Sequence, residues 1–491
     1  MKKYKIILLL MIASITLNSC SEDAMDNINK NVNDPADVPS RFAITDAMTS
    51  TAFSNTGSEL AFYTGVYVEL NAGGFGQMYN AEVRNGEPQN QTTFNNPWNS
   101  TYQTLYNLKL IIDKCSTGSE KNNYTTLGIA QVLYAYNLAL LTDTFGDVPF
   151  TESFQPLVIF QPKMDRQEDL YKIVFSTLEQ AIVNLGKTSS YAILGTQDII
   201  YPGGTTAAPN NSKWIKAANG LLARYTLRLS FKKPDYAKVL TYVSKSFQNK
   251  EEEFKLKNAN IPNPYFQFDN DRTYLFASKS LFDKLNARPN DPRTQGYFQK
   301  IRKTSGAPLT LELYENGVST QSQNYSYSAL IDESNPIFML SYHELLFIKA
   351  EAEARNSAAV TSTASLTAAV NAAFNKDEAV NFSTANATTY VAGLGITTNA
   401  GLLKEIAIQK YFSFYENETV EAYNDYRRLL AMYGTAAAHP IQLANPKNAT
   451  QFPLRLPYGN SDVSTNQNVK AAFGDGTYVY KENVWWAGGT R

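Results

Sequence analysis

Apolar residues recur at steps of three and four along much of the chain, and this spacing constrains the fold more than any other feature. Residues 98–114, for example, place Trp98, Leu105 and Ile112 on one face of a helix. A helix with one apolar face buries that face against another element. Comparable spacing covers residues 41–70, 98–114, 124–142, 165–186, 212–231, 235–248, 341–355, 400–418 and 419–434. The sequence therefore predicts a mostly α-helical protein.

The expected helices follow one another as in proteins that are built from antiparallel helix pairs. This arrangement predicts a TPR-like scaffold, although the chain does not carry the strict TPR repeat consensus. Two of the helices have a capping signal at their start. Glu344 follows Ser341 and Glu168 follows Asp165 at the spacing of a capping box.

Three segments interrupt the helical pattern. Residues 71–91 are rich in Gly and Asn and are expected to form a long loop. Residues 255–335 combine prolines with short alternating stretches, and residues 435–491 are irregular as well. Long loops inside a compact protein are usually functional or disordered. We therefore expect long irregular loop insertions with a few short strands.

The N-terminus has the layout of a secretory signal. Lysines precede a nearly apolar run over residues 6–15, and small or polar residues lead to Cys20. The apolar run is shorter than the about 20 residues that a membrane-spanning helix needs. Residues 17–20, Leu-Asn-Ser-Cys, look like a bacterial lipobox. Residues 1–19 are thus predicted to be a lipoprotein signal peptide and Cys20 the lipidated residue; the alternative is an ordinary signal in which Cys20 is incidental.

Residues 20–40 are polar, contain two prolines and are expected to form a flexible lipidated tether. Glu22, Asp23 and Asp26 resemble the acidic signal that carries certain Gram-negative lipoproteins to the outer face of the outer membrane. Acyl chains on the N-terminal cysteine would hold the protein on a membrane without a spanning helix. Residues 41–491 are then expected to form a single α-helical domain.

The composition argues against several classes of function. The formal net charge of the chain is −1 and no long basic run is present, so nucleic acid is not an expected partner. His343 and His439 are the only histidines, which argues against a histidine-rich zinc site and against a Ser-His-Asp triad. Glycan hydrolysis by two carboxylates needs no histidine and stays open.

Four segments together resemble one protein family, and each of them alone would be a weak signal. They are Leu140–Phe154, Asn290–Arg293, Pro336–Arg355, and Ile406–Arg428 with the terminal stretch Phe452–Trp486. In this order they are similar to the SusD/RagB family of nutrient-binding outer-membrane lipoproteins, and most similar to its SusD-like branch. The resemblance spans nearly the whole chain after residue 19.

The resemblance implies both a fold and a function. Members of the family have a mostly helical scaffold of TPR-like helix pairs, and irregular insertions form their ligand face. They are not enzymes. They capture glycans or peptides at the cell surface and, as a lid, hand them to a SusC-like TonB-dependent barrel. The resemblance therefore implies a surface-exposed, lipid-anchored protein of the outer membrane whose partner is such a barrel.

Several charged residues in the motifs have structural explanations. Asp143 and Asp147 are candidate ligands of a structural calcium ion, although capping of turns accounts for both. No other cofactor or metal is expected. Arg293 is expected to pair with a carboxylate, and Asp425, Arg427 and Arg428 are expected to form an ion-pair set on one helix.

The ligand site is expected in the insertions. Aromatic faces stack on the apolar surfaces of sugars and peptides, while amide and guanidinium groups fix the orientation by hydrogen bonds. Two stretches have this mixture and supply the candidate ligand-binding residues Phe75, Gln77, Tyr79, Asn80, Arg84, Asn324, Tyr325 and Tyr327. The alternative is that these loops contact the barrel.

The sequence thus predicts a cell-surface binding protein that captures an oligosaccharide or an oligopeptide and delivers it to a transporter. Two alternatives stay open. A surface glycan hydrolase would carry two carboxylates about 5–10 Å apart in a cleft. A structural or adhesive lipoprotein would bind no small ligand.

Overall fold

The computed structural model describes residues 38–86, 89–155, 157–203, 211–257, 260–299, 310–357 and 363–491. Cys20, the predicted signal peptide and most of the predicted tether lie outside the described residues. Residues Ser40–Arg491 form one compact unit. No described helix combines the length and the apolar character that crossing a membrane requires.

The structure is mostly helical, as predicted. The helices are α3 (Ser40–Thr49), α4 (Glu59–Tyr67), α5 (Gly76–Glu82), α6 (Asn95–Ser116), α7 (Tyr124–Phe145), α8 (Gln167–Leu185), α9 (Asn211–Arg228), α10 (Tyr236–Val243), α11 (Pro264–Asp271), α12 (Lys279–Asn286), α13 (Arg293–Gly296), α14 (Tyr342–Asn356), α15 (Ala364–Phe374), α16 (Ala387–Gly393), α17 (Asn399–Ser413), α18 (Thr419–Tyr433), α19 (Asn448–Gln451), α20 (Asn460–Thr465) and α21 (Gln467–Phe473). A π-helical turn, η1 (Ser50–Thr56), links α3 to the segment before α4. The long helices agree with the predicted ones.

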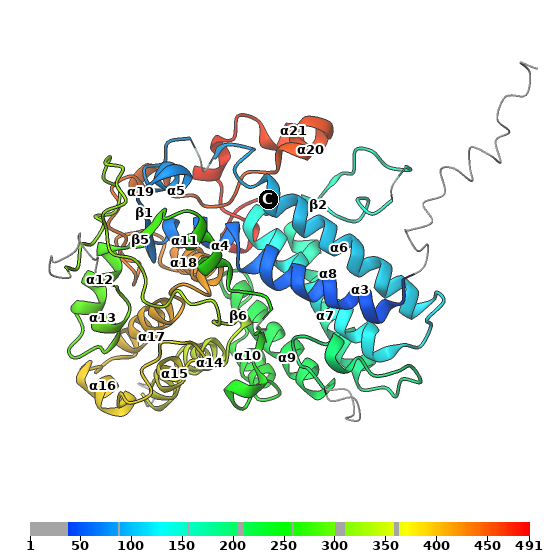
Figure 1. Ribbon diagram of the computed structural model, residues 1–491, viewed down its shortest axis with the longest axis horizontal. Coiled ribbons are helices and arrows are strands. Elements are labelled where there is room, and N and C mark those ends of the chain that lie inside the picture. The colour runs from blue at the N-terminus through cyan, green and yellow to red at the C-terminus, as the bar shows by residue number, and fades with distance from the viewer. Residues whose placement is uncertain are drawn as a thin grey trace, which may run out of the picture. The chain divides into compact units, whose positions relative to one another are not determined.

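Successive long helices pack against one another, as the predicted scaffold of TPR-like helix pairs requires. Helices α6, α7, α8 and α9 form one such series, and α14, α15 and α17 form another (Figure 1). Helix α7 is buried on all sides, because nearly every residue from Thr125 to Phe145 is buried. This explains why its sequence is apolar around the whole circumference rather than on one face.

Short strands occur where the sequence predicted irregular insertions. In the described part of the chain they form three antiparallel pairs. These pairs are β1 (Asn71–Gly73) with β5 (Leu275–Ala277), β2 (Val148–Pro149) with β3 (Met164–Asp165), and β4 (Phe254–Leu256) with β6 (Ile337–Leu340). The insertions are also more regular than expected, since residues 255–335 contain α11 to α13 and residues 435–491 contain α19 to α21.

One of the two predicted helix caps is correct. Helix α14 begins after Ser341, whose hydroxyl accepts a hydrogen bond from the Glu344 backbone at 3.2 Å. The Glu344 carboxylate does not complete the capping box and instead binds Arg224. The other helix, α8, begins close to the predicted position, at Gln167, but the predicted cap was wrong, because Asp165 accepts hydrogen bonds from backbone groups after β2.

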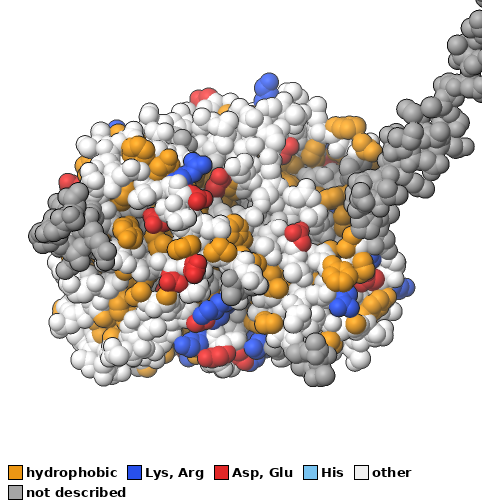
Figure 2. Space-filling view, in the orientation of Figure 1, with side chains coloured by type: hydrophobic (Ala, Val, Ile, Leu, Met, Phe, Trp, Pro, Cys, Tyr) orange, Lys and Arg blue, Asp and Glu red, His pale blue; other side chains and the backbone are white. Residues whose placement is uncertain are grey.

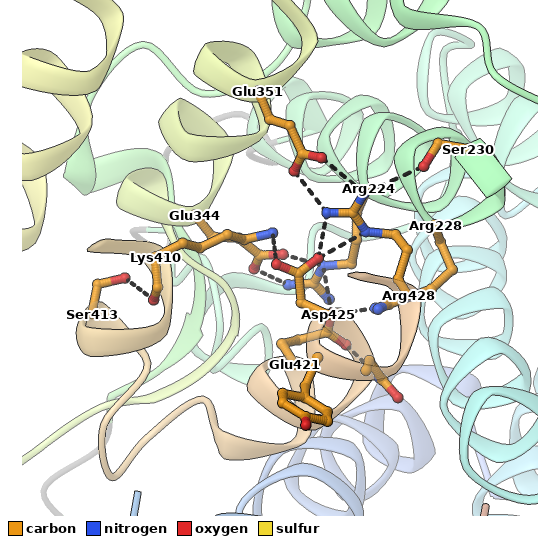
Figure 3. A network of polar contacts seen from close by, with 12 residues as sticks. Arg224, Arg228, Ser230, Glu344, Glu351, Lys410, Ser413, Glu421, Asp425 and Arg428 are labelled. Atoms are coloured by element: carbon orange, nitrogen blue, oxygen red, sulfur yellow. Dashed lines mark hydrogen bonds and ion pairs between the residues drawn. The ribbon is translucent and has the colours of Figure 1, made fainter. Parts of the chain in front are cut away.

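A buried network of charges joins α9, α14 and α18, and Lys410 of α17 extends it to Asp425 (Figure 3). Arg224 of α9 binds Glu344 of α14 through two hydrogen bonds, one of them 2.8 Å from Nε to Oε1. Arg428 of α18 binds both carboxylate oxygens of Glu351 of α14, at 2.9 and 2.7 Å, and also binds Asp425, as the sequence predicted. The network therefore ties α9 and α18 to α14. Arg427, predicted to belong to the same ion-pair set, instead donates to the Asp143 carbonyl at 2.7 Å and to the Asn424 side chain.

The network keeps Glu351 and Glu421 charged in spite of their burial. Burial raises the pKa of Glu351, but the neighbouring Arg428 and Arg355 outweigh this effect and lower that pKa to about 2. Burial likewise opposes ionisation of Glu421, and Arg224 and Arg228 lower its pKa to about 2. Each charge thus depends on its partners, because a buried ion without a partner is costly.

Candidate ligand-binding site

The fold brings together the two stretches in which ligand-binding residues were predicted. Strand β1 pairs with β5, and the Gly74 amide continues the pairing by donating to the Tyr274 carbonyl at 3.1 Å. The Gly74 carbonyl accepts a hydrogen bond from the Ser322 amide at 3.0 Å. Segments near residues 75 and 325 therefore lie side by side, next to the region of α5, β1 and β5 in Figure 1.

The glycines of the first stretch permit this close approach. The sequence predicted a long loop here, and the structure differs. Residues 71–82 make a short strand, a tight turn and helix α5. A Cβ atom on Gly73 would lie 1.9 Å from the Met78 carbonyl oxygen, and one on Gly74 would lie 2.5 Å from the Phe276 ring. Gly76 has a φ of +55°, in the left-handed region that glycine tolerates best.

Aromatic rings cover this region in a connected series. Phe75 is 36% exposed, and its ring centroid is 5.5 Å from that of Tyr274. Tyr325 packs at 5.8 Å from Phe276 and 4.8 Å from Tyr314. Figure 2 shows hydrophobic side chains over the area of α5, β1 and β5, with some charged side chains among them. We call the accessible rings the aromatic patch, which consists of Phe75, Tyr79, Tyr274 and Tyr325.

Amide side chains accompany the aromatic patch. Gln77 and Asn80 of α5 are half-buried, and neither side chain is hydrogen-bonded to another described residue. Asn324 is exposed beside Tyr325. Aromatic faces next to amide groups with free hydrogen-bonding capacity are the chemistry that binds a sugar ring, whose faces are apolar and whose edges carry hydroxyls.

Glu82 holds the two segments of the patch together from beneath. Its carboxylate accepts hydrogen bonds from the Gly73 amide at 3.0 Å and from the Gly317 amide at 2.8 Å. Burial raises the pKa of Glu82 to about 7, although Arg84 and these two amides favour the charged form. The carboxylate thus fixes the relative position of β1 and the segment that leads to Tyr325.

Two of the predicted ligand-binding residues are placed less favourably. Arg84 is buried: it donates to the Asn448 side chain at 2.7 Å and stacks on the Tyr67 ring at 5.1 Å. It supports the site from the interior and does not reach its surface. Tyr327 is half-buried, and its carbonyl accepts a hydrogen bond from the Gln299 amide at 2.8 Å.

The sequence prediction missed the rings that connect the two stretches. Tyr274 and Phe276 come from β5 and its flank, and Tyr314 comes from the segment after residue 310. The alternation of aromatic and aliphatic residues over Tyr274–Ala277 is visible in the sequence. Their position beside Phe75 depends on the pairing of β1 with β5, which joins residues about two hundred positions apart.

The two candidate calcium ligands are used within the protein. Asp143 accepts a hydrogen bond from the Tyr171 hydroxyl at 2.5 Å and lies 3.4 Å from Arg228. Asp147 accepts a hydrogen bond from the backbone amide of Gln167, the first residue of α8, at 2.7 Å. In the described part of the chain, no group of three or more acidic, His or Cys residues is arranged to hold a metal ion.

The predicted pairing of Arg293 is confirmed. Its guanidinium binds both carboxylate oxygens of Asp291, at 2.9 and 2.7 Å, and both residues are buried. Burial raises the pKa of Asp291, but Arg293 outweighs this effect and lowers it below its usual value. The pair therefore belongs to the interior of the protein and is not accessible to a ligand.

A family model covers most of the chain. The SusD-like model described as "Starch-binding associating with outer membrane" matches residues 33–459. The chain belongs to the SusD-like family. The resemblance predicted from its sequence motifs is thus confirmed, and members of this family are associated with the outer membrane. No curated protein matches the chain.

Solved structures of SusD-like proteins have the same fold. A SusD/RagB family protein from Bacteroides thetaiotaomicron is 38% identical, with a TM-score of 0.81 over 93% of this chain and 100% of the other. A chitin-binding SusD homolog from Flavobacterium johnsoniae is 17% identical, with a TM-score of 0.69 over 91% of this chain and 98% of the other. A further protein, named as chitin-binding, is 21% identical with a TM-score of 0.68, over 91% of this chain and 100% of the other.

Proposed function

We propose that this SusD-like protein is a non-enzymatic, lipid-anchored protein of the outer cell surface that captures an oligosaccharide at the aromatic patch and delivers it to a SusC-like TonB-dependent barrel. The observation that carries the proposal is the patch itself, in which Phe75 and Tyr325 from distant segments lie beside free amide groups. The starch-binding description of the family and the chitin-binding names of two structural neighbours support a glycan over a peptide.

The binding function is tested with purified protein and defined ligands. We expect maltoheptaose or chitohexaose to bind in isothermal titration calorimetry, whereas a mixture of neutral hexapeptides does not. Phe75→Ala and Tyr325→Ala should each weaken the glycan affinity about tenfold, which corresponds to about 1.4 kcal/mol per lost ring contact.

Phe42→Ala provides the matched control for these variants. Phe42 is 53% exposed on α3, so its removal deletes an accessible ring outside the patch. If both patch variants bind the glycans with the same affinity as Phe42→Ala, the patch has no role in glycan binding. Binding of the peptides but not of the glycans would transfer the proposal to a peptide ligand, and turnover of the glycan would favour the hydrolase.

Delivery to a barrel requires anchoring at the membrane, which we assign to Cys20. We expect Cys20→Ser to release the protein from outer-membrane fractions, because a single replacement removes every acyl chain of the anchor. Mild detergent extraction of wild-type membranes should recover a TonB-dependent barrel together with the protein, identified by mass spectrometry. Membrane retention of Cys20→Ser, or recovery of the wild type without any barrel, would contradict this part of the proposal.

A further inference from the structure

A groove with aromatic walls lies along α6, on residues that do not belong to the aromatic patch. It runs between α6, the segment that follows β2, and the start of α20, and it has a volume of about 530 Å³. A volume of about 530 Å³ is within the about 300–1,000 Å³ that is usual for small-molecule sites.

One face of α6 forms the floor of the groove. Asn99, Tyr102, Gln103 and Tyr106 share this face, because they are spaced by three and four residues. Phe154 packs on it with its ring centroid 6.3 Å from that of Tyr106 and an interplanar angle of 24°. The floor therefore offers aromatic rings next to amide groups.

The segment after β2 forms the opposite wall and is held at both ends. Asp165 accepts hydrogen bonds from the Phe150 and Thr151 amides, at 2.8 and 2.9 Å. Asn466 donates to the Pro162 carbonyl at 2.8 Å. Between these ends Phe160 lines the groove while remaining 74% exposed. This segment follows β2 in Figure 1. The Phe160 ring is therefore accessible to a ligand in the groove.

Polar groups with free hydrogen-bonding capacity line the groove. The Ser153 hydroxyl is buried and has no hydrogen-bond partner among the described residues. The Asn99 side-chain oxygen accepts from Ser461 at 2.6 Å, which leaves its amide nitrogen available. Asp462 accepts the Trp98 indole N–H at 2.7 Å with one of its two carboxylate oxygens. These groups match the hydroxyls at the edge of a sugar ring.

The charge of the groove selects among ligands. Its described lining residues include no lysine and no arginine, and their one charged group is the Asp462 carboxylate. An acidic glycan would meet this carboxylate without any cation to balance it. A neutral ligand meets no such penalty, because a neutral hydroxyl can donate to Asp462.

We propose that this groove is a second glycan-binding site, separate from the aromatic patch, and that it takes a neutral segment of an oligosaccharide between Tyr106 and Phe160. The inference rests on the proposed glycan-binding function for the class of ligand, but its residues are independent of the patch. A chain that occupies both sites is held at two points, so a long oligosaccharide binds more tightly than a short one.

The test compares groove variants with a control on the same segment. Tyr106→Ala and Phe160→Ala remove rings of the groove, whereas Leu157→Ala removes an 87% exposed side chain that does not line it. In calorimetry with maltoheptaose and chitohexaose, we expect each groove variant to weaken the affinity about tenfold and Leu157→Ala to leave it unchanged. Tri-galacturonate, an acidic probe, is expected not to bind in the groove.

The outcomes separate this inference from the proposed function. If Phe75→Ala weakens glycan binding and both groove variants match Leu157→Ala, the second site is refuted and the proposed function stands. If the wild type binds neither neutral glycan, both the second site and the proposed function are refuted. If Phe160→Ala and Leu157→Ala impair recovery of the barrel without changing glycan affinity, the surface binds a protein and the inference is overturned. Sugar density over Tyr106 in crystals soaked with chitohexaose would support it directly.

Discussion

Replacing Arg224 by Met is expected to destabilise the protein by about 3–5 kcal/mol, because the change leaves the buried Glu344 carboxylate without its partner. Arg224 binds that carboxylate through two hydrogen bonds and also lies 3.7 Å from Glu421. Methionine fills a similar volume without supplying a charge. Urea unfolding followed by circular dichroism measures the loss in the free energy of unfolding.

Two further variants show that the loss comes from the uncompensated charge. Arg224→Met/Glu344→Leu removes both charges of the pair and should recover most of the lost stability, since an apolar replacement of a buried ion pair is often neutral. Lys109→Met breaks an exposed pair with Asp113 on α6 and should cost less than about 1 kcal/mol. A double variant no more stable than Arg224→Met would contradict the assignment.

The helical scaffold was predictable because its signal is local. The apolar spacing along residues 98–114 and 124–142 reports directly on α6 and α7, whose neighbours in sequence are also their neighbours in space. The capping residue Ser341 was predictable for the same reason, since it binds the backbone only three residues away. The role of Glu344 was not, because its partner Arg224 lies on another helix.

The glycine-rich stretch shows how a local signal can mislead. Glycines normally mark loops, and residues 71–91 were therefore expected to form one. In the structure, Gly73 and Gly74 instead allow the backbone of Met78 and the ring of Phe276 to approach closely. Composition alone does not distinguish a glycine that serves a flexible loop from one that serves tight packing.

The residue types of the candidate site were predictable from the sequence, but the prediction did not find all of the residues that form the site. Phe75 and Tyr325 were predicted from the mixture of aromatic and amide residues around them, and the structure brings their segments together. Arg84 fits the same mixture but turns inward to Asn448. Tyr274 was missed because only the pairing of β1 with β5 places it beside Phe75. Site membership depends on such distant pairings.

Glu82→Gln is expected to remove a pH dependence of stability that the wild type shows between about pH 5 and pH 8. The folded protein raises the pKa of Glu82 from 4.5 to about 7, mainly through burial. Between these two values the folded state binds more protons than the unfolded state, so the free energy of unfolding falls as the pH rises and levels off above about pH 7. This group accounts for a loss of about 2–3 kcal/mol over that range.

The difference between wild type and Glu82→Gln isolates this effect. Burial also raises the pKa of Glu416 to about 7, but that group titrates equally in both proteins and cancels in the comparison. Glu315→Gln alters an exposed residue on the segment that Glu82 binds and should leave the pH profile of the wild type unchanged.

Urea unfolding at several pH values measures the profiles. Parallel profiles for wild type and Glu82→Gln would mean that the carboxylate between Gly73 and Gly317 does not titrate in this range, and that the aromatic patch is held equally firmly on both sides of neutral pH.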